Sequence, residues 1–447
     1  MPKRLLVVAA ALLCWAAPAQ AFSKQTGTQA MSDGVSLAYD LYLPDGTAPV
    51  TGWPGVVVLH GLGGSKDDVA AVAGAFATAG YAALAYTSRG EGTSGGDLTL
   101  AGPREIEDER ALESFFAGLP QVSDTAIGAW GISYGGGQVW DGLAAGIPYK
   151  AADVVASWTD LYPALWPQDI ARSGIVVGLE QPILPRSPFI QQFATAAAQS
   201  TDPAAIEALA AQRSVYPKLP SIHVPVAMFQ GRVDWAFDVT QAENGFERLA
   251  GPRRLYIGQF GHVPSTFTTP DFRSYVIPQS VAWLDRWVKG TRNGVDRQPP
   301  VTLAAATGSK RASYPALPKT KVVDVGFRGT ALSRVGPRFQ HGLETFGVSL
   351  LEVQVRKVSS YPRLVAVVKA GNRVITHGAI VPKQGLDTIR LANYVEYLPK
   401  GTRLSVQLGP DGGRSDAAYL GFGATGSIAL GAVDLRLQTL TKPVSGP

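Results

Sequence analysis

The chain has 447 residues, of which 40 are Lys or Arg and 35 are Asp or Glu, so its formal net charge is only +5. Because no cluster of basic residues stands out, the sequence gives no support for a nucleic-acid-binding protein. The five histidines and the single cysteine show no metal-ligand spacing, and we predict no metal or other cofactor. A chain of this length is expected to form two or three domains.

Residues 1–21 have the organisation of a secretory signal peptide. Lys3 and Arg4 precede an apolar run, and the small-x-small sequence Ala19-Gln20-Ala21 follows it. The apolar run is too short for a comfortable membrane span. The only cysteine also lies in this segment, so the mature chain can form no disulfide. We therefore predict a secreted or periplasmic protein with no stable membrane span after cleavage.

Residues 22–300 alternate strand and helix patterns, which predicts an α/β domain with a mostly parallel sheet. It opens with two strand patterns, 25–30 and 35–43, on either side of a Ser-Asp-Gly turn. The short apolar run 55–59 is typical of a strand buried on both faces. The alternation stops after residue 158 and resumes at residue 224. The intervening segment, 159–221, is too long for a loop and is expected to form a helical cap.

The pattern changes after residue 300. Short runs with a period of two residues follow one another, with Gly, Pro and Asn between them and no long helical pattern. This is typical of an antiparallel sandwich, so residues 301–447 are predicted to form an all-β, jelly-roll-like domain. The expected strands are 320–325, 348–355, 364–368, 388–391, 403–408 and 429–435.

The most informative motif is Gly131-Ile132-Ser133-Tyr134-Gly135, which matches Gly-x-Ser-x-Gly. An apolar strand pattern leads into it and a helical pattern leads out. On such a sharp strand-to-helix turn a serine hydroxyl stands clear of the backbone, and the two glycines allow neighbouring backbone to pass close by. The motif predicts that Ser133 is a catalytic nucleophile.

A serine hydroxyl needs a base to take its proton. In hydrolases with such a turn the acid comes next in the chain and the histidine last, each after a late strand. Asp234 follows the strand pattern that ends near Gly231, and His262 follows the final strand pattern of the domain. His262 would be the general base and then the general acid, and Asp234 would hold its tautomer. Asp238 is an alternative acid, or a helix cap.

The oxyanion of the reaction needs two hydrogen-bond donors. The backbone N–H of Tyr134 is one candidate. The second is expected from the Gly-rich loop His60-Gly61-Leu62-Gly63-Gly64, and we choose the N–H of Leu62. A second Gly-rich stretch, 90–95, matches G-x-G-x-x-G, but no helix pattern opens there and no acidic residue ends the next strand. A dinucleotide site is therefore not predicted.

Several of these stretches together resemble one branch of the α/β-hydrolases, which holds cocaine esterase, the X-Pro dipeptidyl-peptidases and related acylases. The resemblance is carried by residues 60–68, 88–96, 131–136, 158–161 and 231–235. Residues 398–404 also resemble a strand-entry motif of the jelly-roll domain that follows the hydrolase domain in this branch. The resemblance covers nearly all of the mature chain and implies a serine hydrolase.

One departure from this branch concerns the oxyanion hole. Cocaine esterase and its peptidase relatives place a tyrosine hydroxyl there, from the loop that corresponds to residues 60–64. This chain has Leu62 and no tyrosine in that loop, so a second backbone amide would have to replace the hydroxyl. An X-Pro peptidase also needs acidic groups for the free amine of its substrate, and the cap offers Asp160, Asp169 and Glu180.

We therefore predict a secreted serine hydrolase that cleaves carboxylic esters, or amides, through an acyl-enzyme on Ser133. Its partners would be small ester, amide or peptide substrates, with no nucleic acid. The alternative within this class is a peptidase similar to the X-Pro dipeptidyl-peptidases. The alternative from another class is a non-catalytic protein that binds a surface or a carbohydrate through its sandwich.

Overall fold

The computed structural model describes residues 22–180, 189, 191–192, 195–196, 203–262, 265–329, 332–414, 416–421 and 426–446. The predicted signal peptide lies outside the described residues, as does most of the cap segment between residues 181 and 202. In the described ranges no helix has the length and apolar character needed to cross a membrane.

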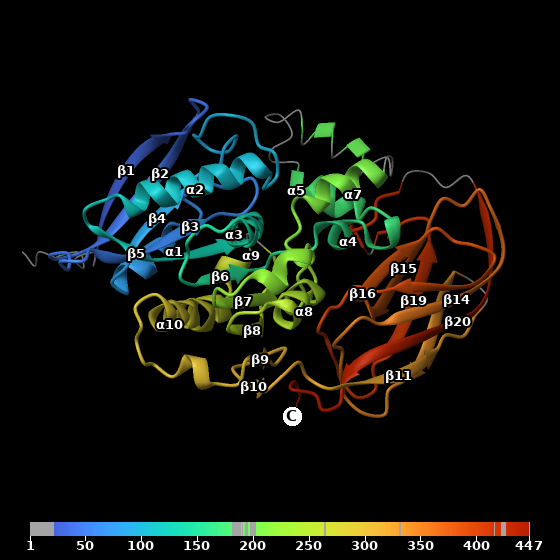
Figure 1. Cartoon of the computed structure of the whole chain (residues 1–447). Helices are drawn as coiled ribbons and strands as arrows, with labels where there is room; N and C mark the ends of the chain where they lie inside the picture. Colours follow the sequence, from blue (N-terminus) through green and yellow to red (C-terminus); the bar gives the residue numbers. More distant parts are fainter. Residues whose placement is uncertain are drawn as a thin grey trace, which may run out of the picture.

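A ten-stranded sheet forms the centre of the first part of the chain (Figure 1). Its strands, in order across the sheet, are β1 (Phe22–Ala30), β2 (Ser36–Pro44), β4 (Ala82–Tyr86), β3 (Trp53–Leu59), β5 (Val122–Ile132), β6 (Ala152–Val155), β7 (Val226–Gly231), β8 (Arg253–Gly258), β9 (Val301–Ala304) and β10 (Arg311–Tyr314). Neighbours from β4 to β9 pair in parallel. The predicted N-terminal hairpin is confirmed by the antiparallel pair β1–β2.

The α/β sheet extends beyond the boundary predicted at residue 300. β9 pairs in parallel with β8, and β10 pairs antiparallel with β9. The short apolar run 301–304 is fully buried, as expected for a strand with covered faces. The first strand of the sandwich begins only at Thr320.

Helices cover both faces of this sheet. The main ones are α1 (Ala70–Thr78), α2 (Pro103–Ala117), α3 (Tyr134–Ala144), α8 (Val239–Arg248) and α10 (Ile277–Trp287), with the short segments α9 (Ser265–Thr268), η3 (Phe272–Val276) and η4 (Val295–Arg297) before and after α10. The first apolar core holds side chains of α2, α3 and α8, and the second holds side chains of α1 and α10. Because the central strands are buried on both faces, their sequences are nearly continuous apolar runs.

The predicted cap is a set of short helical segments between β6 and β7: α4 (Leu161–Leu165), η1 (Pro167–Asp169), α5 (Ser173–Glu180), α7 (Pro203–Ala211) and η2 (Tyr216–Ser221). In Figure 1 they lie between the α/β sheet and the C-terminal strands. A third apolar core joins them to both parts, because it contains Ile175 and Ile206 of the cap together with Tyr134 and with Val365 of the C-terminal part.

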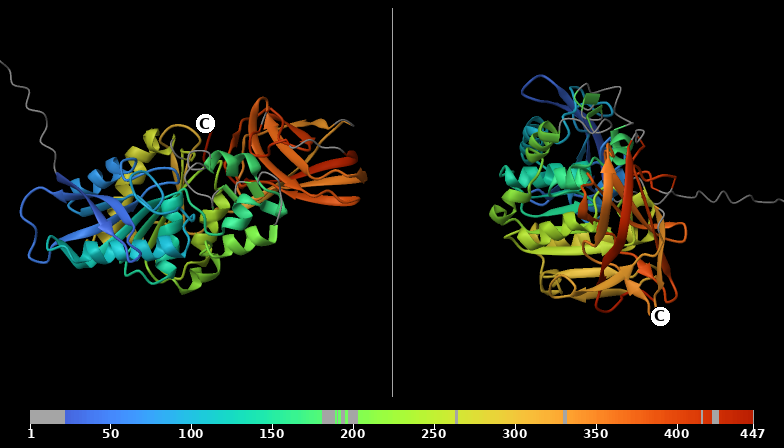
Figure 2. Two further views of the ribbon diagram at one scale, coloured as in Figure 1. Left: turned by 90° about the horizontal axis from the view of Figure 1, so that it is seen from above. Right: turned by 90° about the vertical axis from the view of Figure 1, so that its right-hand side faces the viewer.

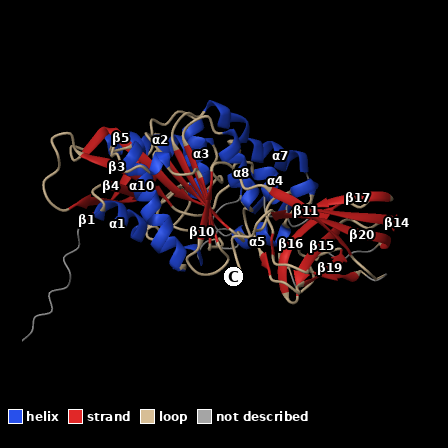
Figure 3. Ribbon diagram, turned by 90° about the horizontal axis from the view of Figure 1, so that it is seen from below, coloured by secondary structure: helices blue, strands red, loops and turns tan. Residues whose placement is uncertain are grey.

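The C-terminal part is a sandwich of two four-stranded antiparallel sheets, seen edge-on in Figure 3 and in two further directions in Figure 2. One sheet has the order β11 (Thr320–Gly326), β20 (Ser427–Leu440), β14 (Leu350–Ser359), β17 (Gly385–Arg390). The other has the order β12 (Ser333–Arg338), β19 (Arg403–Gly409), β15 (Leu364–Ala370), β16 (Arg373–Ile380), and a small ladder joins β13 (Leu343–Glu344) to β18 (Tyr397–Leu398). An apolar core fills the space between the two sheets.

Candidate active site

Ser133 lies between β5 and α3, on the strand-to-helix turn that the sequence predicts. Its backbone has φ 55° and ψ −117°, a strained conformation for a residue with a side chain. A Cβ atom on Gly131 would lie 2.3 Å from the Gly135 carbonyl oxygen, and one on Gly135 would lie 2.5 Å from the Leu59 carbonyl oxygen. The two glycines are therefore required by close backbone contacts on both sides of the serine.

The structure brings the three predicted triad residues into one chain of contacts. The Ser133 Oγ lies 2.8 Å from Nε2 of His262. The His262 Nδ1 lies 3.0 Å from the Asp234 carboxylate. All three side chains are buried. Because the carboxylate can only accept, Nδ1 carries the proton and Nε2 is free to accept the serine proton.

The carboxylate of Asp234 is held in place by three further donors. Its Oδ1 accepts the backbone N–H groups of Ala236 and Phe237, at 2.9 and 3.0 Å. Its Oδ2 accepts a 2.9 Å hydrogen bond from the Gln230 side-chain amide. Together these donors fix the orientation of the carboxylate toward His262.

Asp238, the alternative acid, lies at the N-cap of α8. Its Oδ1 accepts the Thr240 N–H at 3.0 Å, and its Oδ2 accepts the Asn393 N–H at 2.8 Å. It therefore makes the contact expected of a helix cap and also joins α8 to the C-terminal part. The carboxylate that contacts His262 is that of Asp234.

The predicted oxyanion loop packs directly against the serine turn. The ring of His60 lies 6.4 Å from that of Tyr134, and the side chain of Leu62 packs on the apolar core that contains Tyr134. Tyr134 is the first residue of α3, where a helical N–H has no acceptor within the helix. The Leu62 N–H likewise has no hydrogen-bond partner among the residues that the structure describes.

Two buried side chains fix this loop. The Ser88 N–H donates to Nε2 of His60 at 3.0 Å, and the other ring nitrogen donates to the Gly61 carbonyl at 2.7 Å. Burial lowers the pKa of His60 to about 4, so its ring is neutral near pH 7. The Gly63 N–H donates to the carboxyl group of Glu91, whose pKa burial raises well above its usual range. The Gly-rich stretch 90–95 thus supports the loop.

Aromatic rings surround the histidine. Trp235 and Phe237 lie edge-on to His262, with ring centroids 5.3 and 5.4 Å away. Phe237 also contacts Trp158, at 5.1 Å. Trp235 is 40% exposed although it is next to the buried acid. The predicted base is therefore flanked by aromatic groups.

Several residues of this site were not predicted from the sequence. Gln230 is the last residue but one of the buried strand β7, four residues before Asp234. A polar residue near the end of a buried strand is a signal by which the sequence could have identified it. Arg172 of the cap donates to the carbonyls of Trp235 and Ala236, at 2.6 and 2.8 Å, and so fixes the loop after the acid. Nothing local in the sequence points to Arg172, because its partners lie in distant elements.

The acidic groups of the cap lie in different surroundings. Asp160 accepts a 3.3 Å hydrogen bond from Ser214, and burial raises its pKa. Asp169 accepts one from the Tyr162 hydroxyl at 3.1 Å, while the Glu180 side chain lies outside the described residues. In the described part of the chain, no group of three or more His, Cys, Asp or Glu side chains could hold a metal ion.

The parallel sheet, with a serine on a strained turn after its central strand, defines an α/β-hydrolase. The model of the X-Pro dipeptidyl-peptidase family (S15 family) matches residues 33–264, and the chain belongs to this family. It is thus a hydrolase of the serine class. A search of curated proteins gave no match.

Solved structures agree with this assignment at the level of the fold. A CocE/NonD family hydrolase from Staphylococcus aureus is 16% identical, with a TM-score of 0.70 over 95% of this chain and 93% of that one. An aminopeptidase from a marine sediment Thaumarchaeota archaeon is 13% identical, with a TM-score of 0.67 over 94% and 97%. An α-amino acid ester hydrolase is 14% identical, with a TM-score of 0.64 over 96% of each chain. The similarity therefore includes the C-terminal sandwich.

Proposed function

We propose that Ser133 attacks the carbonyl carbon of a carboxylic ester or amide and forms an acyl-enzyme. The observation that carries this proposal is the unbroken chain of contacts from Ser133 Oγ through His262 to Asp234. His262 takes the serine proton and then gives it to the leaving alcohol or amine. A water molecule, activated by His262 in the same way, then releases the carboxylic acid.

The negative charge of the tetrahedral intermediate would be stabilised by the N–H groups of Tyr134 and Leu62. Two such donors, fixed before the reaction begins, stabilise charge where it develops. The buried Glu91 and His60 support this role because they hold the loop that carries Leu62. The loop of residues 60–64 contains no tyrosine whose hydroxyl could take the place of the second backbone amide.

Esters are the substrates that we favour, with X-Pro peptides as the second candidate. A site with two backbone donors is the arrangement of ordinary esterases and lipases. The alternative function, a peptidase, is supported by the family to which the chain belongs and by the aminopeptidase among the similar structures.

The test is covalent labelling with a fluorophosphonate together with a substrate screen on the mature protein. Wild type should be labelled and should hydrolyse p-nitrophenyl esters faster than X-Pro-p-nitroanilides. Ser133→Ala should abolish labelling and lower kcat by about 10⁴ or more. Retention of a tenth of the activity, a loss of only ~1.4 kcal/mol in transition-state stabilisation, would disprove the assignment. A protein that is never labelled would favour the non-catalytic alternative.

We also propose that the protein is exported and cleaved after Ala21. The first described strand of the sheet, β1, begins at Phe22, so cleavage at this point would leave every described strand in the chain. Sequencing of the exported protein should give Phe22 as its first residue. An N-terminus that retains Lys3 and Arg4 would contradict the proposal.

A further inference from the structure

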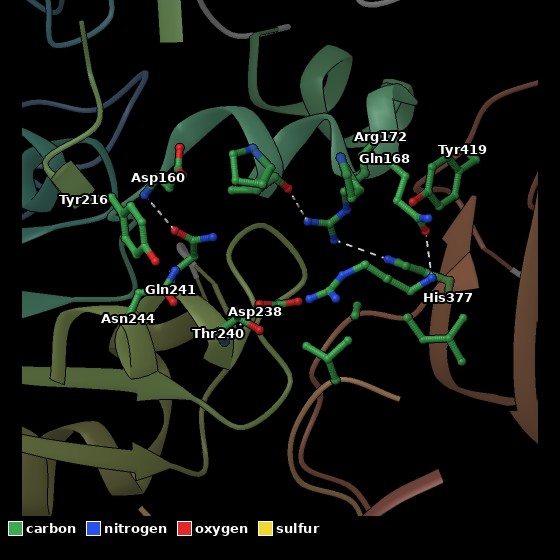
Figure 4. Close-up of a pocket in the computed structure, with 17 residues that line it drawn as sticks. Asp160, Gln168, Arg172, Tyr216, Asp238, Thr240, Gln241, Asn244, His377 and Tyr419 are labelled. Carbon is green, nitrogen blue, oxygen red and sulfur yellow. Dashed lines mark hydrogen bonds between the residues drawn. The ribbon is translucent and has the colours of Figure 1, made fainter. Parts of the chain in front are cut away.

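A cavity of about 320 Å³ lies where the cap, α8 and the C-terminal sandwich meet (Figure 4). Arg172 and Tyr419 line one side, and Asp160 and Gln241 line the other. None of the triad residues lines it. The volume is within the range of small-molecule sites, and the cavity is distinct from the place where Ser133 would hold its acyl group.

The cavity is lined by a buried cation that forms no direct ion pair among the described residues, although Asp416 reaches it through the ring of His377. Arg172 is only 3% exposed. Its hydrogen-bond acceptors among the described residues are backbone carbonyls, the Tyr394 hydroxyl and His377, and no carboxylate forms an ion pair with it. Buried charges in proteins are normally paired, so the absence of a carboxylate here requires an explanation.

Three residues that line the same cavity carry unsatisfied donors. The Arg172 Nε, the Tyr419 hydroxyl and the Thr240 hydroxyl have no hydrogen-bond partner among the described residues, although all three atoms are buried. Tyr419 is 1% exposed. Buried polar atoms without a partner are rare in native proteins. Three of them on one cavity indicate a polar ligand that accepts hydrogen bonds.

The charges on the walls set the kind of ligand. Arg390 adds a second guanidinium to the lining, and within the described ranges it has no ion-pair partner. Asp160 and Asp238 line the cavity on the side of α4 and α8 and would repel a second negative group there. The apolar lining residues Pro163, Ala164, Val348 and Leu391 can cover a hydrocarbon tail.

We propose that this cavity binds a small monocarboxylate, with its carboxylate between Arg172, Arg390 and Tyr419 and its apolar tail against the cap and the sandwich. The ligand would supply the direct ion-pair partner that Arg172 lacks among the described residues. Charge-assisted hydrogen bonds to a guanidinium are about twice as strong as neutral ones, so the charge of the ligand should matter more than its tail.

The first experiment is calorimetric titration of the full mature protein with hexanoate and with its neutral isostere, hexanamide. It is done on protein blocked at Ser133 by a fluorophosphonate, because a carboxylate could also enter the catalytic pocket. We expect the blocked protein to bind hexanoate at least tenfold more tightly than hexanamide. If the blocked protein binds neither compound, or binds both equally, the proposal is wrong.

The second experiment locates the site. Tyr419→Phe removes only a hydroxyl that has no partner in the described structure, and Arg390→Gln removes only an unpaired charge, so neither variant should disturb the fold. Each should weaken hexanoate binding about tenfold. Tyr361→Phe and Arg436→Gln, which lie in the sandwich away from the cavity, should leave it unchanged. Equal binding by all four variants would overturn the proposal even if Ser133 proved not to be a nucleophile, since the variants do not depend on the triad.

Discussion

Asp234 and Asp238 are only four residues apart, but their carboxylates contact different groups. Asp234 contacts His262, whereas Asp238 caps α8 and receives the Asn393 N–H. We expect Asp234→Asn to lower kcat by about 10⁴ with an intact fold, because an amide stabilises the wrong histidine tautomer. Asp238→Asn should leave kcat within a few fold and lower the free energy of unfolding by about 1 kcal/mol, as for a weakened cap.

Steady-state kinetics on p-nitrophenyl esters, with circular dichroism to verify the fold, measure both effects. The two variants serve as controls for each other, because each removes one negative charge from the same loop. If Asp238→Asn were the inactive variant, Asp238 would be the acid and the contact between His262 and Asp234 would have another purpose.

Leu62 is proposed to act through its backbone alone. Leu62→Ala should therefore change mainly KM, because it removes only packing on the apolar core beside Tyr134. Leu62→Pro deletes the N–H and should lower kcat by about 10²–10³, the usual effect of losing one oxyanion donor. Proline also fixes φ, so the melting temperature of this variant must be compared with that of Leu62→Ala.

An equal kcat for the alanine and proline variants, with equal melting temperatures, would exclude the Leu62 N–H from the oxyanion hole. If both variants kept the wild-type kcat, the second donor, which acts together with the Tyr134 N–H, would be a different backbone amide of the same loop. The comparison thus separates the loss of one donor from damage to the loop.

Residues in local motifs could be predicted from the sequence, whereas residues whose role depends on distant partners could not. Ser133 stands in a five-residue motif and His262 in a loop just after a strand, and the structure brings both together. The choice between Asp234 and Asp238 stayed open in the sequence because either can follow β7. Arg172 was missed because its partners lie in the loop after Asp234 and in the sandwich.

At the scale of elements, the turn between β5 and α3 is the most constrained part of the fold. A Cβ atom on Gly135 would meet two backbone oxygens, those of Leu59 and His60, at 2.5 and 2.6 Å. Backbone cannot rotate away as a side chain can. We therefore expect Gly135→Ala to displace α3 from the central strand, to lower kcat more than tenfold and to cost about 1–3 kcal/mol of stability.

The matched control is Gly178→Ala in the cap helix α5, where an added Cβ meets no atom of the described residues within 4 Å. Alanine is the better helix former by about 1 kcal/mol, so this variant should be slightly more stable and fully active. Thermal melts and initial rates of the two variants test the argument. Wild-type kcat in Gly135→Ala would show that the close backbone contact is unimportant for the site.

The helices and strands that could be predicted were those with a clear periodicity of apolar residues in the sequence. The two strands of the N-terminal hairpin and six strands of the sandwich follow their expected positions within a few residues. β12 and β16 were not predicted. β12 contains glycine and proline, which weaken a strand pattern, and β16 is almost continuously buried, so it does not alternate.

At the scale of the whole molecule, buried polar contacts join the sandwich to the catalytic part. Arg232, two residues before Asp234, donates to the Glu344 carboxylate at 2.6 Å and to the Ala304 carbonyl at 2.5 Å. The Val395 N–H of the C-terminal part donates back to the Arg232 carbonyl at 2.8 Å. Because these bonds meet the loop that carries Asp234, the position of the sandwich and the geometry of the contacts between Ser133, His262 and Asp234 are linked.

Glu344 is fully buried, and its two oxygens accept from Arg232, from the Ser445 hydroxyl and from the N–H groups of Val444 and Ser445. Glu344→Gln keeps the volume but removes the negative charge and turns an amide NH₂ toward donors. Breaking a buried ion pair from one side costs about 3–5 kcal/mol. We expect this variant to unfold in two steps, the sandwich first, where wild type unfolds in one.

Calorimetric melts measure this directly, and Glu352→Gln on β14 is the control, since no ion pair of Glu352 occurs among the described residues. A surface change of that kind should alter stability by no more than about 0.5 kcal/mol. Glu344→Gln should also lower kcat at 20 °C, below its first transition, because Arg232 would no longer be fixed beside the acid loop. A single transition at the wild-type temperature with unchanged kcat would mean that the sandwich and the triad are energetically independent, and that the junction merely connects two parts that stand alone.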